Sequence, residues 1–357
     1  PEVNNGPAYK GDAPLSGSCR DGEGDHCGGR SDGQCWCDDS CELWGNCCAD
    51  RAEVCGGSEP VEGGLQYKSY NVLFTNPLCR DYSYDEPLAT ADGEGTREQK
   101  PKNVFCTYSD IGASGNRVTS PQYQIVQWLG ELGQGDEVFL AYLSFSNRTV
   151  ASALCEAAER GAKITFILDR PTDRGNELVV CGGTVLSRGH VGGIGYAHNK
   201  VLLINPKASG PGDADTGYMR MAFSSGNMSS GAVLHHENWH FIEVKRESYF
   251  ADAHRCLMEA QLDEDASASK SAYRASINAC REASAYPEET DIGAYFIPNK
   301  DDSRAISDRM VAGIEHATRI DIGAHRFGYP VLIDALADRL RDDGVQMRMV
   351  ADDDVYW

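Results

Sequence analysis

One pattern of apolar and polar positions occurs twice along the chain. In each copy, a short apolar run of strand type is followed by apolar residues at helical spacing and then by a second strand-type run. The first copy occupies 135–145, 150–160 and 161–169, and the second occupies 318–327, 331–341 and 344–352. Because strands that alternate with helices are typical of α/β proteins, the sequence predicts an α/β fold built from a repeated unit.

A candidate phosphate site follows the first copy. His198 and Lys200 lie two residues apart before an apolar run at 201–204, and Ser225 and Asn227 show the same spacing further on. Residues two apart on a strand face the same side. A neutral imidazole can attack phosphorus or shuttle a proton, while an ammonium, a hydroxyl and an amide can hold phosphate oxygens. His-x-Lys alone is common by chance, so the combination with Ser-x-Asn is what favours a phosphate site.

This combination resembles the signature of the phospholipase D superfamily, which reads His-x-Lys, four residues, Asp, and then Gly-Ser or Gly-Gly followed by x-Asn. The chain departs from the signature at two positions, because Ser224 replaces the glycine and Asn205 stands where the family usually has Asp. That Asp lies away from the phosphate in the family, so its loss affects the match more than the chemistry. The resemblance implies a phospholipase D-like repeated α/β sandwich.

The resemblance also implies an activity, which is hydrolysis of a phosphodiester through a phosphohistidine intermediate, with no metal and no cofactor. It makes His198 the nucleophile or general acid, and it makes Lys200, Ser225 and Asn227 the ligands of the phosphate. Glu237 sits where related nucleases carry a Glu that hydrogen-bonds the catalytic histidine. A carboxylate on the second imidazole nitrogen would fix the tautomer, so Glu237 is the candidate orienting residue.

The second repeat is expected to be incomplete in this sequence. It reaches Asp352, which corresponds to Asp169 of the first copy, five residues before Trp357. A second His-x-Lys is therefore expected beyond residue 357 or on a partner chain. The alternatives are that two chains pair their single motifs, or that the protein has lost the activity and is an extracellular interaction or structural protein that retains the fold.

Eight cysteines near the front predict a small disulfide-rich module, because so short a segment with few aliphatic residues cannot build a sufficient core. They are Cys19, Cys27, Cys35, Cys37, Cys41, Cys47, Cys48 and Cys55. Their spacing resembles the somatomedin B family of secreted interaction modules. The pairing that this resemblance implies is Cys19 to Cys37, Cys27 to Cys55, Cys35 to Cys48 and Cys41 to Cys47. A zinc site is the rival interpretation, although zinc clusters usually show two spaced Cys-x2-Cys pairs.

The remaining six cysteines also form an even set, and Cys256 with Cys280 is a candidate pair. Cysteine use of this kind indicates a secreted or lumenal protein. A start at Pro1 instead of Met agrees with removal of a signal peptide, and no apolar run is long enough for a transmembrane segment. Asn147 begins a glycosylation sequon, Asn-Arg-Thr, on a predicted loop.

The net charge of the chain limits which partners it can bind. The formal net charge of −21 disfavours tight, sequence-independent binding of long nucleic acids, without excluding cleavage of a phosphodiester in one. The expected partners are a phosphodiester substrate, either phospholipid or nucleic acid, a protein bound through the front module, and a second chain carrying the missing half-site.

These patterns divide the chain into segments of different character. The predicted divisions are a leader at 1–18, the somatomedin B-like module at 19–55, a linker at 56–64, the first α/β repeat at 65–248, a helical connector at 249–290, and the start of the second repeat at 291–357.

Overall fold

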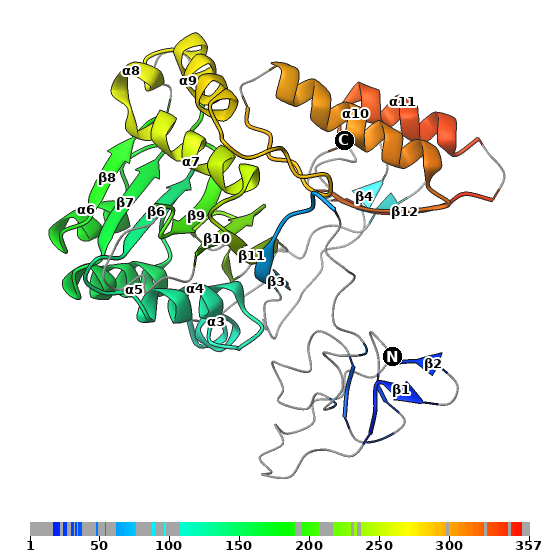
Figure 1. The fold of residues 1–357 in the computed structure, drawn as a ribbon, viewed down its shortest axis with the longest axis horizontal. Coiled ribbons are helices and arrows are strands. Elements are labelled where there is room, and N and C mark those ends of the chain that lie inside the picture. Colours follow the sequence, from blue (N-terminus) through cyan, green and yellow to red (C-terminus); the bar gives the residue numbers. More distant parts are fainter. Residues whose placement is uncertain are drawn as a thin grey trace. The chain divides into compact units, whose positions relative to one another are not determined.

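A seven-stranded mixed sheet is the centre of residues 65–357 in the computed structural model (Figure 1). Its order is β3-β11-β10-β9-β6-β7-β8. The strands β6, β7 and β8 are parallel, whereas β9, β10, β11 and β3 continue the sheet with antiparallel pairings. The strands are β3 (Tyr67–Phe74), β6 (Glu137–Tyr142), β7 (Lys163–Leu168), β8 (Thr184–Ser187), β9 (Lys200–Ile204), β10 (Tyr218–Ser224) and β11 (Asn238–Lys245).

The structure describes most of the chain after residue 107 and separate stretches before it. The described residues are 17–21, 24–26, 30–31, 33, 35–37, 48, 54, 62–75, 88–89, 96–97, 108–189, 195–207, 217–229, 232–233, 237–297, 300–324, 327–341 and 344–351. Contacts divide the chain into two units, Pro1–Gly64 and Leu65–Trp357.

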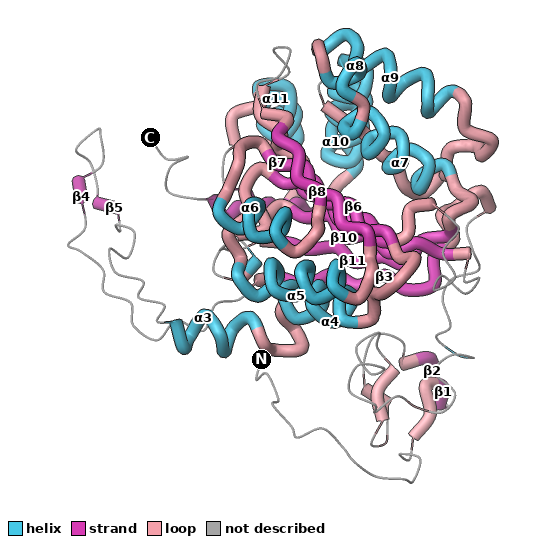
Figure 2. Tube along the Cα trace, turned by 90° about the vertical axis from the view of Figure 1, so that its left-hand side faces the viewer, coloured by secondary structure: helices cyan, strands magenta, loops and turns pink. Residues whose placement is uncertain are grey.

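Two layers of helices cover the sheet, one on each face (Figure 2). One face packs against α4 (Pro121–Gly130), α5 (Arg148–Glu159) and α6 (Asp173–Val180). The other packs against α7 (Tyr249–Leu262), α8 (Glu264–Ser267) and α9 (Lys270–Glu282). The helices of 249–290, expected as a connector between the repeats, therefore form one of the two layers of the core. A further helix, α3 (Tyr108–Gly115), precedes α4.

The interior strand β6 shows why the core has two halves. Val138, Leu140 and Tyr142 pack on the side of α4 and α5, while Phe139 and Ala141 pack on the side of α7, as alternation along a strand requires. All five are buried, which explains why the apolar run is continuous in the sequence.

Asn147, the predicted glycosylation site, is the N-cap residue that precedes helix α5. Its Oδ1 accepts a hydrogen bond from the backbone N–H of Val150 at 3.0 Å, which is an ordinary N-cap. Its Nδ2 donates to Oε1 of Gln122 at 2.8 Å. The side chain thus has a structural role, and its glycosylation stays a prediction.

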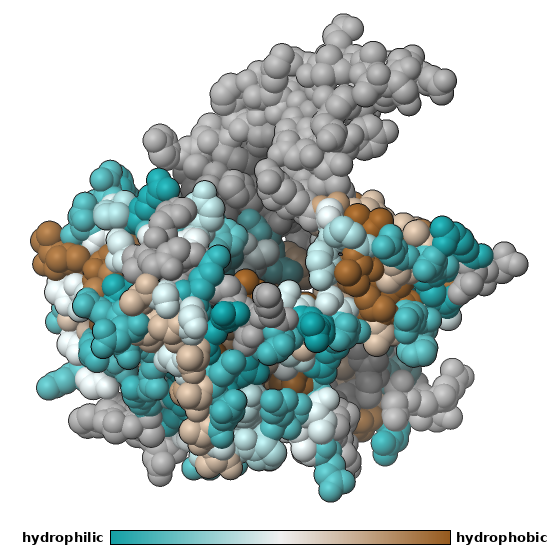
Figure 3. Space-filling model, turned by 90° about the horizontal axis from the view of Figure 1, so that it is seen from above, coloured by the Kyte–Doolittle hydropathy of each residue, from teal (hydrophilic) through white to brown (hydrophobic). Residues whose placement is uncertain are grey.

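The second copy of the repeat has the predicted order of elements. It comprises α10 (Lys300–His316), β12 (Arg319–Ala324), α11 (Pro330–Arg339) and β13 (Gln346–Ala351). The strands β12 and β13 pair in parallel, as β6 and β7 do in the first copy. Exposed apolar side chains, among them Met310, Val331 and Ile333, gather over α10 and α11 on the right-hand side of Figure 3. The prediction of an α/β fold with a repeated unit is confirmed.

The front unit is described in short stretches. They include β1 (Arg20–Asp21), β2 (Gly24–Asp25) and the disulfides Cys19–Cys37 and Cys35–Cys48, which are two of the four expected pairs. The other two pairs involve Cys27, Cys41, Cys47 and Cys55, which lie outside the described residues. Two short strands, β4 (Leu88–Ala89) and β5 (Thr96–Arg97), pair with each other after this unit.

Two more disulfides lie in the α/β unit. Cys155–Cys181 joins α5 to the end of α6, and Cys256–Cys280 joins α7 to α9, as the sequence suggested. Among the described helices, none combines the length and the apolar character that crossing a bilayer requires.

Candidate active site

The sheet brings the predicted phosphate-binding residues to one of its ends. His198 lies two residues before Lys200, the first residue of β9, and β9 runs antiparallel to β10. The start of β9 therefore lies beside the end of β10, where Ser225 and Asn227 follow. Glu237 comes just before β11, the antiparallel neighbour of β10, so it reaches the same end. Three adjacent strand ends thus supply the predicted groups.

The His198 and Lys200 side chains are in contact. Nζ of Lys200 lies 3.2 Å from each ring nitrogen of His198 and donates to the His198 carbonyl oxygen at 3.1 Å. Burial lowers the pKa of His198, the charge of Lys200 lowers it further, and Asp169 opposes both effects. A lowered pKa keeps the imidazole neutral near pH 7, which is the form that a nucleophile needs.

Lys200 is itself partly withdrawn from water. Burial lowers the pKa of its ammonium group, and the negative charge of Glu237 acts in the opposite direction. Glu237 therefore interacts electrostatically with Lys200.

Asp169 anchors the chain where it enters the His-x-Lys motif. This buried residue follows β7, and its Oδ1 accepts a hydrogen bond from the backbone N–H of Ala197 at 2.8 Å. Its backbone oxygen accepts from the N–H of Gly189 at 3.0 Å. A Cβ atom at Gly189 would collide with the Asp169 carboxylate and backbone, so glycine is required there. In the sequence Asp169 is recognisable only as the end of the first repeat, and nothing in the pattern predicts this role.

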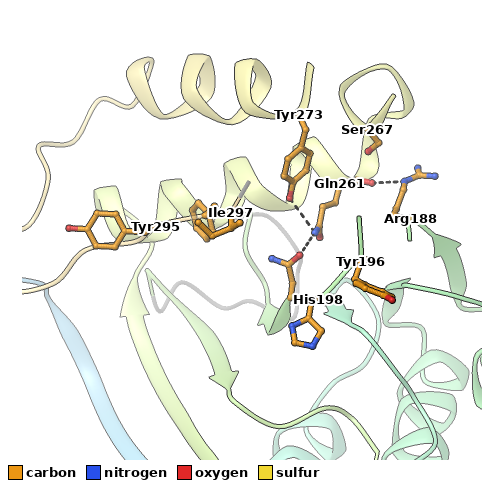
Figure 4. Close-up of a pocket in the computed structure, with 11 residues that line it drawn as sticks. Arg188, Tyr196, His198, Gln261, Ser267, Tyr273, Tyr295 and Ile297 are labelled. Atoms are coloured by element: carbon orange, nitrogen blue, oxygen red, sulfur yellow. Dashed lines mark hydrogen bonds between the residues drawn. The ribbon is translucent and has the colours of Figure 1, made fainter. Parts of the chain in front are cut away.

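Asn199 connects the His-x-Lys motif to the helix layer that contains α7 and α9. Nε2 of Gln261, on α7, donates to Oδ1 of Asn199 at 2.7 Å and lies 3.4 Å from the hydroxyl of Tyr273, on α9 (Figure 4). Gln261 and Tyr273 are both buried. Because Asn199 lies between His198 and Lys200, this chain of polar contacts fixes the backbone that carries both side chains. Sequence reasoning did not identify Gln261 or Tyr273, since neither belongs to a motif.

Ser225 and Glu237 are hydrogen-bonded to each other. The Ser225 hydroxyl donates to Oε2 of Glu237 at 2.6 Å and accepts from the backbone N–H of Asn238 at 3.1 Å. The backbone N–H of Glu237 donates to the Thr75 hydroxyl oxygen at 2.7 Å. The expected hydrogen bond from His198 to Glu237 stays a prediction.

Asn227 lies in a turn that backbone bonds hold in place. The carbonyl oxygen of the following residue, Met228, accepts from the N–H groups of Ser146 and Asn147 at 3.1 and 3.2 Å. Oδ1 of Asn227 is buried and has no hydrogen-bond partner among the described residues. Asn227 stays a predicted phosphate ligand.

Asn205, the departure from the family signature, lies at the far end of β9 from Lys200. It has a left-handed backbone with φ 52°, a conformation that Asn tolerates better than most residues. Its Oδ1 accepts from the backbone N–H of Glu137 at 2.9 Å, and its Nδ2 donates to Oδ1 of buried Asp136 at 2.8 Å. An amide suits this position because it offers both a donor and an acceptor.

Within the described part of the chain, one cluster has the geometry of metal ligands, and it consists of Cys19, Cys37 and Cys48. All three are in disulfides, so none is available as a thiolate. No described group near His198 forms such a cluster.

Comparisons with known proteins give likenesses in structure only. No family model matches the sequence. No curated protein matches it either. Its structure is similar to that of Nuc from Salmonella typhimurium, a phospholipase D family member, at 13% identity and TM-score 0.32, over 40% of this chain and 86% of Nuc.

Two further structures are similar to that of this chain. NucT from Helicobacter pylori is 14% identical with TM-score 0.32, over 44% of this chain and 92% of NucT. Phosphatidylserine synthase from Haemophilus influenzae is 10% identical with TM-score 0.42, over 64% of this chain and 58% of the synthase. The chain therefore spans just over half of the synthase. All three TM-scores lie below 0.5.

Proposed function

We propose that this protein is a secreted, metal-independent phosphodiesterase of the phospholipase D type, with His198 at its reaction centre. The observation that carries the proposal is the contact between Lys200 and the His198 ring, 3.2 Å apart, at the sheet end that Ser225 and Asn227 also reach. A cation, a hydroxyl and an amide beside a neutral imidazole are the groups that phosphoryl transfer requires.

In the proposed reaction, a ring nitrogen of His198 attacks phosphorus and forms an N–P bond while the P–O bond to one ester group breaks. The leaving alkoxide takes a proton from a second acid. Water then attacks the phosphohistidine, its proton passes to that same group, and the released His198 completes the cycle. Lys200, Ser225 and Asn227 hold the non-bridging oxygens, and Glu237 orients the nucleophile by accepting a hydrogen bond from the second ring nitrogen of His198.

The second acid needs a source, because the sequence holds a single His-x-Lys. We propose that a second His-x-Lys, from outside these 357 residues or from a second copy of the chain, supplies it. The repeated α/β unit supports this arrangement, since two related units can each bring one motif to a shared cleft.

Hydrolysis of bis(4-nitrophenyl) phosphate in the presence of EDTA tests the proposal. His198→Ala is expected to reduce the rate by about a hundredfold to ten-thousandfold or more, since it removes the attacking group. The matched control is His316→Ala, which alters an exposed histidine at the end of α10 and should leave the rate unchanged. Dependence on a divalent metal, or full activity in His198→Ala, would contradict the mechanism.

The alternative function is an extracellular interaction protein that retains the fold without the activity. The single motif and the disulfide-rich front unit support it. Secretion is common to both functions and is supported by the four disulfides that join described cysteines. In the alternative function, the somatomedin B-like module is the part of the chain that binds a protein.

A further inference from the structure

A cavity of about 390 Å³ opens beside His198 (Figure 4). Its walls come from the loop before β9, from α7 and α9, and from the segment at 295–297. His198 itself is part of the lining, so a phosphodiester bound at this imidazole would direct one of its two ester groups into the cavity. The shape of the cavity therefore bears on which ester group the site accepts.

Aromatic and hydrogen-bonding side chains share this lining. Tyr196 and Ile297 are 64% and 59% exposed, so both offer apolar surface to a ligand. Tyr273 and Gln261 are buried residues of the same lining, with the Gln261 amide held between Asn199 and Tyr273. A pocket with an exposed aromatic ring and fixed polar groups suits a flat ring that carries hydrogen-bonding atoms.

The charge of the lining is unlike that of the chain as a whole. Among the described residues that line the cavity there is no carboxylate, although the chain carries a net charge of −21. The lining contains one arginine, Arg188, whose guanidinium donates to the carbonyl oxygens of Gln261 and Leu262 at the end of α7. The local field therefore favours a neutral or anionic group over a cationic one.

We propose that this cavity binds the base of a nucleotide phosphodiester, with Tyr196 as the stacking platform. The inference rests on the proposed function, since it takes the phosphate to lie at His198. A nucleoside is of the size that a pocket in this range encloses, whereas a pair of acyl chains needs a longer aliphatic groove. The acidity of the remaining chain repels long polyanions, so the substrate is a mononucleotide ester or a short single strand.

Titration calorimetry with adenosine 5′-monophosphate and ribose 5-phosphate tests the assignment, because the two ligands share the phosphate and differ in the base. Stacking of a base on an aromatic side chain predicts that adenosine monophosphate binds about 10- to 100-fold more tightly. Tyr196→Ala should remove this difference and leave the Kd of ribose 5-phosphate unchanged, and Tyr196→Phe should preserve it. Tyr67→Ala, which alters a similarly exposed tyrosine on β3, is the matched control.

Two further measurements separate this inference from the proposed function. Lys200→Met should weaken both ligands equally, because it removes a contact with the phosphate that they share. Three results would overturn the nucleobase site alone. The two ligands could bind equally, or adenosine monophosphate could keep its tighter binding in Tyr196→Ala. The third such result is tighter binding of dihexanoylphosphatidylcholine than of adenosine monophosphate. Absence of binding by either phosphate would overturn the phosphate site together with it.

Discussion

Changing Asn205 to Asp tests why the chain departs from the family signature at this position. The Asn205 amide accepts from the backbone of Glu137 and donates to Oδ1 of Asp136 at 2.8 Å. Aspartate has the same size and keeps the first bond, but an ionised carboxylate cannot donate the second. Two carboxylates this close inside the protein cannot both remain ionised, so the variant must hold a proton between them.

The magnitude follows from the free energy of holding that proton. Each pH unit above the ordinary Asp pKa of about 3.9 costs about 1.36 kcal/mol, so the free energy of unfolding falls by up to about 4 kcal/mol at pH 7. At pH 5 the same calculation gives about 1.5 kcal/mol. The loss is therefore largest at neutral pH and shrinks as the solution becomes acidic.

Urea denaturation of the whole chain at pH 5 and pH 7, followed by near-ultraviolet circular dichroism, measures the effect. The double variant Asp136→Asn with Asn205→Asp is the matched control, because it returns one amide and one carboxylate to the pair. It should recover most of the lost stability, as coupling between residues in contact predicts. Equal stability of Asn205→Asp and the unaltered protein at pH 7 would refute the reasoning.

Three further variants address the site and the core. Lys200→Met should raise the pKa of His198 in an NMR titration, because it removes a cation that lowers it; an unchanged or lower pKa would contradict the contact. Burial lowers the pKa of His254 to about 4, so its contribution to stability is complete above pH 6.5 and is lost as the pH falls toward 4. The free energy of unfolding should therefore fall by about 3 kcal/mol between these pH values. Urea denaturation of His254→Gln should show no such fall, because the variant has no imidazole to protonate. Replacing Cys256 and Cys280 by alanine should lower the free energy of unfolding by about 2–4 kcal/mol in the same assay. Unchanged stability would contradict a stabilising role of this disulfide.

The repeat and the motif could be predicted because both depend on short-range sequence patterns. Buried strands and amphipathic helices have periods visible within a dozen residues, and His198 with Lys200 is a local pair. The contacts that hold this pair are different, since Asp169 and Gln261 reach it from 28 and 62 residues away in the chain. Such contacts depend on how the layers pack, and the only signal in the sequence was that Asp169 ends an apolar run.

The role of Asn205 shows a second limit of reading a motif. Judged against the family signature, Asn205 is a missing carboxylate and weakens the match. Its hydrogen bond to Asp136, from another strand end, gives the position a structural function that the motif does not contain. The residue could be judged correctly only when its partner was known.

Detection of the covalent intermediate tests the central claim most directly. The protein is mixed with bis(4-nitrophenyl) phosphate and EDTA, quenched in alkali, in which phosphohistidine is stable, and digested for mass spectrometry. The account predicts a 4-nitrophenyl phosphoryl adduct on His198, and no adduct on any residue in His198→Ala. Hydrolysis of the substrate with no adduct on His198, or at an undiminished rate in His198→Ala, would contradict it.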